Sequence, residues 1–299
     1  MKNIIKGFRS GSWTYRHPTD GEITIAYQQA GSGPALLLLH GFPQSKIIWH
    51  LIAPTLAKHY TVIASDLRGY GQSSKPAGQP DHSNYSKRSM AQDQVELMKH
   101  VGFDHFYLLG HDRGGRVSHR LAADHPAAVE KLMVLDISPT LAMYEQTNMA
   151  FAQGYWHWFF LIQKHPIPET MIGADVEFFM KQLMGGRHAG LSIFEQSCWD
   201  EYVTAMQNPA CAHAMCEDYR AAASIDLVHD RADIAAGKKI SMPLRVLWGE
   251  HGLVNQCFNP LADWSKVALK VTGKTVPSGH YIPEEAPDIL IEEALAFFK

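Results

Sequence analysis

Short apolar runs alternate with helical patterns along most of the chain. The runs are ALLLLHG (35–41), TVIASD (61–66), HFYLLGHD (105–112), KLMVLDI (131–137) and LRVLWGE (244–250). Such runs are typical of strands that are buried on both faces of a sheet. Between them, residues 89–102 and 114–126 have apolar positions at helical spacing. Strands that alternate with helices predict an α/β protein with a mostly parallel central sheet flanked by helices.

One long region interrupts this alternation. Residues 142–225 contain no convincing strand, and their apolar positions recur at helical spacing, as in DVEFFMKQLM (175–184). We therefore predict a core formed by residues 1–141 and 226–299, with residues 142–225 inserted as a helical cap. A cap at this point of the chain would cover the carboxyl ends of the strands, where open α/β sheets bind their ligands.

Composition narrows the classes of function. The 299 residues are 46% hydrophobic and 19% charged, so the chain can bury a large core. A net charge of −3 gives no basic footprint for nucleic acid or for an anionic membrane surface. No apolar run approaches the roughly 18 residues of a membrane span, and residues 1–18 lack the apolar centre of a signal peptide. The four cysteines show no disulfide or metal spacing, so we expect reduced thiols in a cytoplasmic protein.

The sequence LLGHDRGG (108–115) carries the clearest chemical signal. It joins an apolar run to a helical pattern with the spacing of a nucleophile elbow, G-x-nucleophile-x-G, and Asp112 holds the nucleophile position. Glycines suit such a sharp turn because they leave space where a Cβ atom would clash with the sheet. The turn would project Asp112 into a pocket beside the N-terminus of the following helix. The alternative is that Asp112 only caps that helix.

The residue type at the elbow restricts the reaction. A serine attacks carbonyl carbons and forms an acyl ester that water can clear, but its attack on a saturated carbon would leave an inert ether. A carboxylate that attacks a saturated carbon forms an alkyl ester, which water can open at the enzyme's own carbonyl carbon. Asp112 therefore predicts displacement at a saturated carbon, in a carbon–halogen bond or in an epoxide.

The second step of such a reaction requires a base and an acid that orients it. His280 lies in SGHYIP (278–283), after a predicted last strand and before the final helix, at the chain position expected for the histidine that accompanies such an elbow. The orienting acid could follow either of two strands. Gly252 occupies the first position, so we predict that Asp136, at the end of KLMVLD, orients His280. A surface histidine and a strand-capping aspartate are the alternatives.

The loop HGFP (40–43) follows a predicted strand, at the place where an elbow of this kind completes its oxyanion hole. We predict that the backbone N–H groups of Phe42 and Arg113 form this hole. His40 is expected to stabilise the loop rather than to react.

These motifs together resemble the α/β-hydrolase superfamily over nearly the whole chain. The shared motifs are HGFP, SDLRGYGQSS, GHDRGG, VLDI, LWGE and SGHYIPEEAP. Within the superfamily, the arginine behind the nucleophile (HDRGGR), the cap sequence YWHWFF and the stretch CEDYRAAASIDLVHD resemble the fluoroacetate dehalogenases. This narrower resemblance implies a hydrolase that converts a haloacetate, above all fluoroacetate, into glycolate and halide without a cofactor or a metal.

The resemblance also implies roles for individual residues. Arg113 and Arg116 would hold the substrate carboxylate. The hydrogen-bond donors to the departing halide would be His157, Trp158 and Tyr219. Two guanidiniums beside the nucleophile also suit a small anionic substrate on chemical grounds. A helix-surface ion pair for Arg116 and plain cap core for the aromatic residues are the alternatives. Family analogy further implies a homodimer.

Other functions stay open at this point. Cap tyrosines at Tyr155, Tyr202 and Tyr219 would suit an epoxide hydrolase, although that activity gives no reason for paired arginines. Haloalkane dehalogenases carry a tryptophan where Arg113 stands, so Arg113 favours a charged substrate, and other small haloacids would fit as well. A non-catalytic small-ligand receptor would not need the three predicted catalytic residues together.

Overall fold

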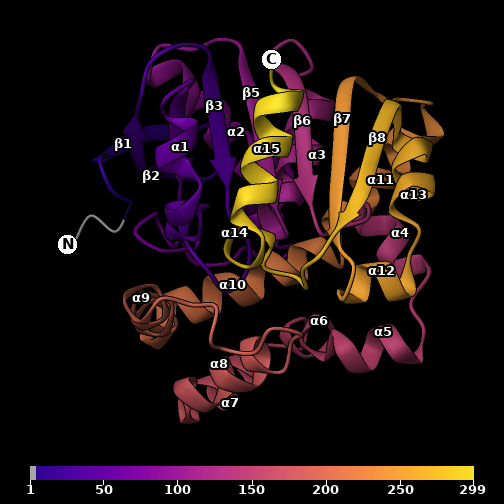
Figure 1. The fold of residues 1–299 in the computed structure, drawn as a ribbon. Helices are drawn as coiled ribbons and strands as arrows, with labels where there is room; N and C mark the ends of the chain where they lie inside the picture. The colour runs from indigo at the N-terminus through magenta and orange to yellow at the C-terminus, as the bar shows by residue number, and fades with distance from the viewer. Residues whose placement is uncertain (1–4) are drawn as a thin grey trace.

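An eight-stranded sheet runs through the centre of the protein (Figure 1). The computed structural model describes residues 5–299. The strands are β1 (Arg9–His17), β2 (Gly21–Ala30), β3 (Ala35–Leu39), β4 (Thr61–Ser65), β5 (Phe106–His111), β6 (Val129–Leu135), β7 (Ile240–Gly249) and β8 (Ala268–Val276). Their spatial order is β1-β2-β4-β3-β5-β6-β7-β8, antiparallel from β1 to β4 and parallel from β4 onward. The predicted α/β architecture with a mostly parallel sheet is confirmed.

Helices fill the connections between the strands from β3 onward. The first half contains η1 (Lys46–Leu51), α1 (Ala53–Leu56), η2 (Ser83–Tyr85), α2 (Lys87–His100) and α3 (Arg113–Asp124). Between β6 and β7 lie α4 (Thr140–Glu145), α5 (Met149–Gly154), α6 (Trp156–Leu161), α7 (Ile167–Ala174), α8 (Val176–Gly185), α9 (Gln196–Gln207), α10 (Pro209–Ala222) and α11 (Ile225–Ala235). The last part contains α12 (Leu253–Cys257), α13 (Pro260–Val267), α14 (Ile282–Glu285) and α15 (Pro287–Phe297). Among the described residues 5–299, no helix has both the length and the apolarity of a membrane span.

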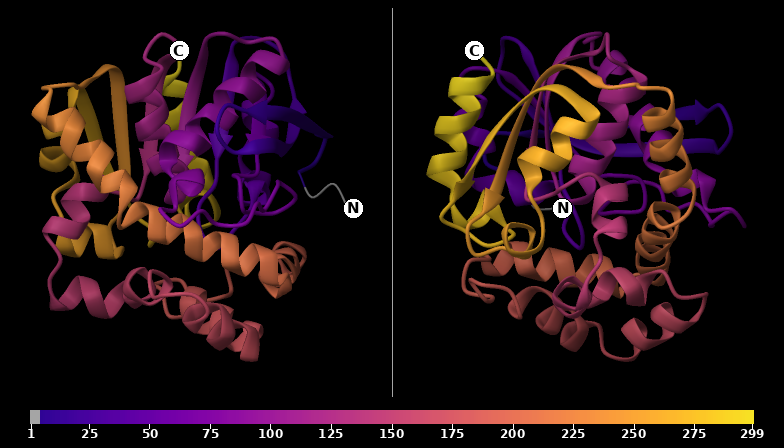
Figure 2. Two further views of the ribbon diagram at one scale, coloured as in Figure 1. Left: turned by 180° about the vertical axis from the view of Figure 1, so that it is seen from behind. Right: turned by 90° about the vertical axis from the view of Figure 1, so that its right-hand side faces the viewer.

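Two apolar cores form because successive side chains of a strand point to opposite faces of the sheet. In β3, Leu36 and Leu38 belong to one core, whereas Leu37 and Leu39 belong to the other. Helices α1 and α15 cover the first face, and α2 and α3 cover the second (Figure 2). All five residues of β3 are buried, which explains why this strand is a continuous apolar run in the sequence.

Helices α5–α10 form a layer of their own across one end of the sheet (Figures 1 and 2). They make up the cap, and α4 and α11 connect it to the core. The predicted limits at 142 and 225 fall within α4 and at the first residue of α11. Helix α11 itself lies against the core, where Asp230 and Asp233 bind Arg120 of α3. The loops that follow β5, β6 and β8 open toward the cap.

Two glycines allow the turn after β5 to pack tightly against the neighbouring strand. A Cβ atom at Gly114, in the first turn of α3, would lie 2.2 Å from the carbonyl oxygen of Leu39. A Cβ atom at Gly41 would lie 2.5 Å from the Cβ atom of Asp112. Both distances are far below van der Waals contact, so only glycine permits this close approach.

We expect Gly114→Ala to destabilise the protein, because the new methyl group would overlap backbone that cannot move without disturbing β3. The expected loss in the free energy of unfolding is about 1–3 kcal/mol. Gly173→Ala is a matched control, since a Cβ atom there would meet nothing within 4 Å and Gly173 lies within α7. Alanine at this position should stabilise the helix by about 0.5–1 kcal/mol. Denaturant titration measures both changes, and similar values at the two sites would contradict the packing argument.

Candidate active site

Asp112 stands at the tip of a strained turn between β5 and α3. Its backbone has φ 46° and ψ −113°, a conformation that is costly for a residue other than glycine. The side chain makes no capping hydrogen bond to α3, so the helix-cap alternative for Asp112 is wrong. Instead, Oδ1 accepts a hydrogen bond of 2.9 Å from the backbone N–H of Phe42. The strained turn therefore presents a buried carboxylate whose second oxygen, Oδ2, is not engaged by Phe42.

The structure brings His280 and Asp136 to the same place. Nδ1 of the His280 imidazole lies 2.6 Å from Oδ2 of Asp136. Nε2 of His280 lies 4.0 Å from Oδ2 of Asp112. Oδ1 of Asp136 accepts a hydrogen bond of 3.0 Å from the backbone N–H of Gly249, which fixes the carboxylate in turn. Asp136 therefore orients the imidazole so that its other nitrogen faces Asp112.

Burial and nearby charges set the ionisation of these groups. Burial by itself raises the pKa of Asp112. His280 and the guanidiniums of Arg116 and Arg113 act in the opposite direction and hold this pKa below its usual range. Burial, together with the positive charge of Arg187, lowers the pKa of His280 to about 3. At neutral pH Asp112 is therefore an ionised carboxylate and His280 a neutral imidazole, which are the forms that a nucleophile and a base require.

The guanidinium of Arg113 is bound mainly to the cap. Its Nε lies 2.9 Å from Oδ2 of Asp218 in α10, and its Nη2 lies 2.9 Å from Oδ1 of the same residue. Asp218 also binds Lys87, and all three side chains are buried. Of the three guanidinium nitrogens of Arg113, Nη1 alone has no hydrogen-bond partner within residues 5–299, and it is buried. The predicted carboxylate clamp therefore retains one free nitrogen on Arg113 rather than a whole planar fork.

Arg116 lies one turn further along α3 and is only 2% exposed. Its Nη1 donates to the hydroxyl of Thr140 at 3.0 Å, and its Nη2 contacts the sulfur of Met143 at 3.1 Å. Its Nε has no partner in the described part of the chain. The side chain is buried and takes part in no described ion pair, so the helix-surface ion pair considered for Arg116 is wrong. Arg116 is a buried positive charge that makes no described ion-pair contact, although the charge of Asp112 acts on it from a distance.

Aromatic side chains of the cap cover the two arginines. Trp158, in α6, and Tyr219, in α10, are fully buried. The ring of Trp158 lies 4.6 Å from Cζ of Arg116, and the ring of Tyr219 lies 4.1 Å from Cζ of Arg113. Neither the indole N–H of Trp158 nor the hydroxyl of Tyr219 has a hydrogen-bond partner among the residues that the structure describes. The cap therefore adds two unpartnered donors to those of the arginines.

His157 is the third aromatic residue predicted at this site. Its buried ring stacks on the ring of Phe42, with 5.9 Å between the centroids, and lies 6.0 Å from the ring of Tyr219. Burial and the charge of Arg187 lower the pKa of His157 well below its ordinary value. The ring is therefore neutral at pH 7 and keeps one N–H group to donate.

Sequence reasoning missed two charged residues of the site. Asp218 directly precedes Tyr219 in the stretch CEDYRAAASIDLVHD, and the need of a buried arginine for an acid could have pointed to it. Arg187 lies in the loop between α8 and α9, and no spacing in the sequence connects it with the elbow. Its Cζ lies 4.8 Å from the ring centroid of Tyr155, whose hydroxyl is 3.2 Å from Nδ1 of His280. Only the folded chain identifies Arg187 as part of this site.

Among residues 5–299, two clusters outside the site contain residue types that can bind metals. They are His50, Glu195 and Cys198, and, in the cap, His165, Glu169 and His213. Burial raises the pKa of the Cys198 thiol to about 12, so its thiolate form is scarce at neutral pH. Glu169 is already bound by Arg220. Neither cluster includes a residue of the candidate active site, and all four cysteines are free thiols.

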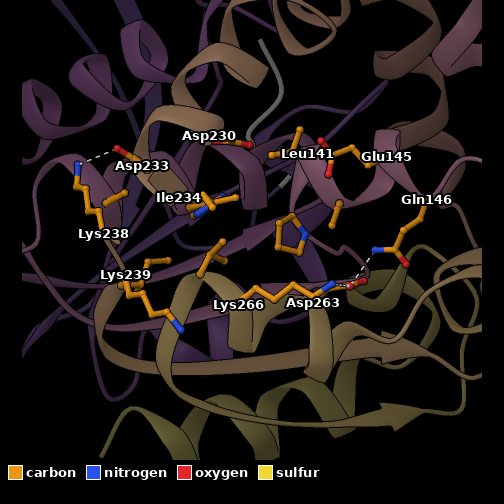
Figure 3. Close-up of a pocket in the computed structure, with 16 residues that line it drawn as sticks. Leu141, Glu145, Gln146, Asp230, Asp233, Ile234, Lys238, Lys239, Asp263 and Lys266 are labelled. Atoms are coloured by element: carbon orange, nitrogen blue, oxygen red, sulfur yellow. Dashed lines mark hydrogen bonds and ion pairs between the residues drawn. The ribbon is translucent and has the colours of Figure 1, made fainter. Parts of the chain in front are cut away.

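A cavity is lined by residues of α3, α4, α11, β7 and α13 (Figure 3). Some of the charged residues around it are paired with one another, as Lys238 is with Asp233 and Lys266 with Asp263. None of the residues predicted from the elbow, the base or the cap aromatics lines this cavity. Asp112 and the unpartnered donors of Arg113, Arg116, Trp158 and Tyr219 lie outside this cavity.

The chain belongs to the α/β-hydrolase family, because residues 34–287 match the family described as alpha/beta hydrolase fold. The matched region includes the elbow, the loop with Phe42 and the loop with His280. A carboxylate at the elbow, beside a neutral imidazole and a cap rich in donors, is a site that can displace a leaving group and then hydrolyse an ester.

Two relatives that are named for different enzyme activities are similar to this chain over most of its length. The chain is 46% identical over 269 residues to the fluoroacetate dehalogenase of Burkholderia sp, covering 90% of this chain and 88% of the relative. It is 35% identical over 277 residues to the soluble epoxide hydrolase of Corynebacterium sp. (strain C12), covering 91% and 92%. A crystal structure from Nostoc sp PCC 7120, provisionally assigned as an alpha/beta hydrolase, is similar with a TM-score of 0.94 at 47% identity over 99% of both chains.

We expect Asp218→Asn to destabilise the protein strongly, because it removes the shared counter-charge of the buried Arg113 and Lys87. Loss of one partner of a buried pair typically costs about 3–5 kcal/mol in the free energy of unfolding. Glu177→Gln is the control, since it breaks only a surface ion pair with Lys181, worth about 0–1 kcal/mol. Denaturant titration of both variants gives the comparison. A loss at Asp218 no larger than at Glu177 would show that this pair does not hold the site together.

Proposed function

We propose that the protein is a hydrolytic dehalogenase that converts a haloacetate, with fluoroacetate as the expected substrate, into glycolate and halide. The observation that supports this best is a group of buried donors without partners in the site, namely Arg113 Nη1, Arg116 Nε, Trp158 Nε1 and the Tyr219 hydroxyl. An unsatisfied buried donor lowers stability, so several together suggest a ligand that satisfies them. A carboxylate and a departing halide consist of acceptors alone, and they match such a set of donors.

In this proposal the substrate carboxylate binds to the two arginines. Arg116 offers a buried positive charge with no acid partner, and Arg113 adds one free nitrogen. The bound carboxylate would place the halogen-bearing carbon in front of Oδ2 of Asp112. A substrate held in line beside the nucleophile reacts in an effectively unimolecular step, which removes much of the entropic part of the barrier.

The first chemical step is displacement at the halogen-bearing carbon. Oδ2 of Asp112 forms the new carbon–oxygen bond while the carbon–halogen bond breaks, and the halide leaves with the bonding electron pair. The product is the carboxymethyl ester of Asp112. The lowered pKa of Asp112 keeps the attacking carboxylate ionised. The donors of His157, Trp158 and Tyr219 would bind the negative charge that develops on the halogen.

The second step is hydrolysis of this ester. Nε2 of His280 takes a proton from a water molecule, and the hydroxide attacks Cγ of Asp112. Negative charge then develops on Oδ1, where the N–H of Phe42 already donates at 2.9 Å and the backbone N–H of Arg113 would add a second bond. The ester bond breaks, and His280 returns its proton to the glycolate hydroxyl. Asp112 keeps one oxygen from water and releases the remaining proton of that water to solvent, which restores the carboxylate.

Epoxide hydrolysis is the second candidate, because the same nucleophile and base would serve it. The unpartnered hydroxyl of Tyr219 favours this reaction, since a phenol could donate a proton to an epoxide oxygen. Tyr202 does not support it, because its hydroxyl donates to Glu284 at 3.1 Å. An epoxide carries no negative charge, so the buried, unpaired guanidinium of Arg116 favours a haloacid over an epoxide.

Substrate tests distinguish the two activities. We expect the protein to release fluoride from fluoroacetate and to leave styrene oxide unchanged, because only the acid can bind the charge of Arg116. His280→Asn should still permit displacement but not hydrolysis, so Asp112 should accumulate as a carboxymethyl ester. Asp112→Ala should abolish turnover without unfolding the chain. A fluoride electrode, a diol assay and mass spectrometry of the peptide that contains Asp112 provide the readings.

Contrary outcomes are equally specific. Diol from styrene oxide without fluoride release would favour the epoxide hydrolase. One equivalent of fluoride from His280→Asn with an unmodified Asp112 peptide would contradict the covalent mechanism. Binding of fluoroacetate without any product would indicate a small-ligand receptor on this fold.

The cap donors generate a separate prediction about the leaving group. Fluoride is small and leaves poorly, so it needs hydrogen bonds as the carbon–fluorine bond breaks, whereas chloride needs them less. Trp158→Phe and Tyr219→Phe should therefore lower kcat/KM for fluoroacetate much more than for chloroacetate. Loss of one such donor typically costs on the order of 10²–10³ in rate. The ratio of kcat/KM values for the two substrates in each variant measures the effect.

Trp156→Phe is the matched control, because Trp156 lies on the same helix α6 as Trp158 but is 38% exposed. This variant should leave the ratio unchanged. Equal losses on fluoroacetate and chloroacetate in Trp158→Phe and Tyr219→Phe would mean that these side chains only shape the pocket.

A further inference from the structure

A third guanidinium reaches the site from the cap. Arg187 lies in the loop 186–195 between α8 and α9. Its Cζ lies 4.8 Å from the ring centroid of Tyr155 and 5.4 Å from that of Tyr281. The hydroxyl of Tyr155 is 3.2 Å from Nδ1 of His280, and Tyr281 follows His280 in the chain. Arg187 therefore lies next to the proposed base, on the cap side.

The following residue holds this loop against the core. The ring of His188 stacks on the ring of His251, with centroids 4.1 Å apart and an interplanar angle of 23°. A Cβ atom at Gly279 would lie 3.0 Å from the Cβ atom of His188, so Gly279 lies close to the His188 side chain. Gly279 directly precedes His280. The loop therefore carries Arg187 to a defined position beside the base rather than leaving it on the outer surface.

The charge of Arg187 has no counter-charge in contact. Within residues 5–299, its guanidinium takes part in no described ion pair, and its buried Nε has no hydrogen-bond partner. The hydroxyl of Tyr281 is likewise buried and without a partner in that range. The carboxylates whose charges act on Arg187 from a distance are Asp112 and Asp136. Arg187 therefore has a buried N–H donor without an acceptor, as Arg113 and Arg116 do.

Exposure distinguishes Arg187 from the two inner arginines. Arg113 and Arg116 are 0% and 2% exposed, and Asp112 is 4% exposed, so solvent scarcely reaches them. Arg187 is partly exposed, although its Nε is buried. An anion that travels from solvent to Asp112 has to pass the cap. A guanidinium with one side toward solvent and the other toward the site is placed to meet it.

We propose that Arg187 and the hydroxyls of Tyr155 and Tyr281 form an outer anion-binding site, where a small carboxylate binds before it reaches Arg113 and Arg116. The proposal rests on the haloacid function proposed above, because it concerns the first contact of the same substrate. The two rings orient the guanidinium through cation–π contacts and leave N–H groups for the ligand. Charges placed along an approach path typically raise association rates by about 10–10³-fold, an effect that salt weakens.

Steady-state kinetics across a range of ionic strength tests this site. For Arg187→Gln we expect kcat/KM for the haloacetate to fall about tenfold at low salt, with kcat nearly unchanged and a flatter salt dependence. Arg187→Lys should recover most of the loss, since capture of an anion needs the charge more than the planar fork. Lys181→Gln is the matched control, because it removes a positive charge from the cap at an exposed position paired with Glu177. It should change neither kcat/KM nor its salt dependence.

Three results would overturn the outer site. One is a fall in kcat with an unchanged KM, which would assign Arg187 to the chemical steps. Another is a kcat/KM and a salt dependence for Arg187→Gln equal to those of the unmodified protein. The third is an equal loss in Arg187→Gln and Arg187→Lys, which would point to a structural role of the arginine side chain.

Binding of acetate separates a failure of this inference from a failure of the proposed function. Acetate carries the carboxylate but no leaving group, and the fluorescence of the buried Trp158 provides a signal for stopped-flow mixing. We expect acetate, but not neutral acetamide, to bind, with an association rate about tenfold lower in Arg187→Gln. An unchanged rate in that variant would refute the outer site alone. A protein that binds no acetate and turns over no haloacetate would refute the proposed function.

Discussion

The buried ion pair between Arg113 and Asp218 is the contact on which the geometry of the site depends. Arg113 begins α3 directly after the elbow, and Asp218 lies in α10 of the cap. The pair therefore ties the core to the cap at the point where the two meet, and it holds Tyr219 over the guanidinium. Lys87 and Tyr70 also bind the Asp218 carboxylate. A buried carboxylate with this many partners stabilises one position of α10 over the elbow.

Several buried charges elsewhere in the described chain are paired with an opposite charge, and Arg116 differs from them. Arg68 binds Asp93 through two nitrogens, and Asp66 accepts hydrogen bonds from both the backbone and the ammonium group of Lys46. Arg116 has contacts only with neutral groups. Charged groups that are left without counter-charges lower the stability of the apo protein, so they are consistent with a site prepared for an anion.

Backbone strain is concentrated in the same place. Among the described residues, non-glycine residues with positive φ are His82, Asp112 and Asp136, and two of these three carry the carboxylates of the site. Both follow parallel strands of the sheet, β5 and β6, and the surrounding strands and glycines hold them in these conformations. The strain directs Asp112 away from the end of α3 and places Asp136 against His280.

Contiguous patterns in the chain predicted the sheet and the elbow. The positions of His280 and Asp136 after predicted strands led to the prediction that they act together with Asp112. A strand buried on both faces, such as β3, shows its environment directly as an apolar run, and an elbow is a local turn whose glycines and nucleophile are neighbours in sequence. The partners of the arginines were not accessible in this way. Asp218 stands about a hundred residues from Arg113, and Arg187 lies in an irregular cap loop without any motif. Which guanidinium nitrogens are free, and which remain for a ligand, depends on how the cap packs on the core, and only the tertiary structure decides that.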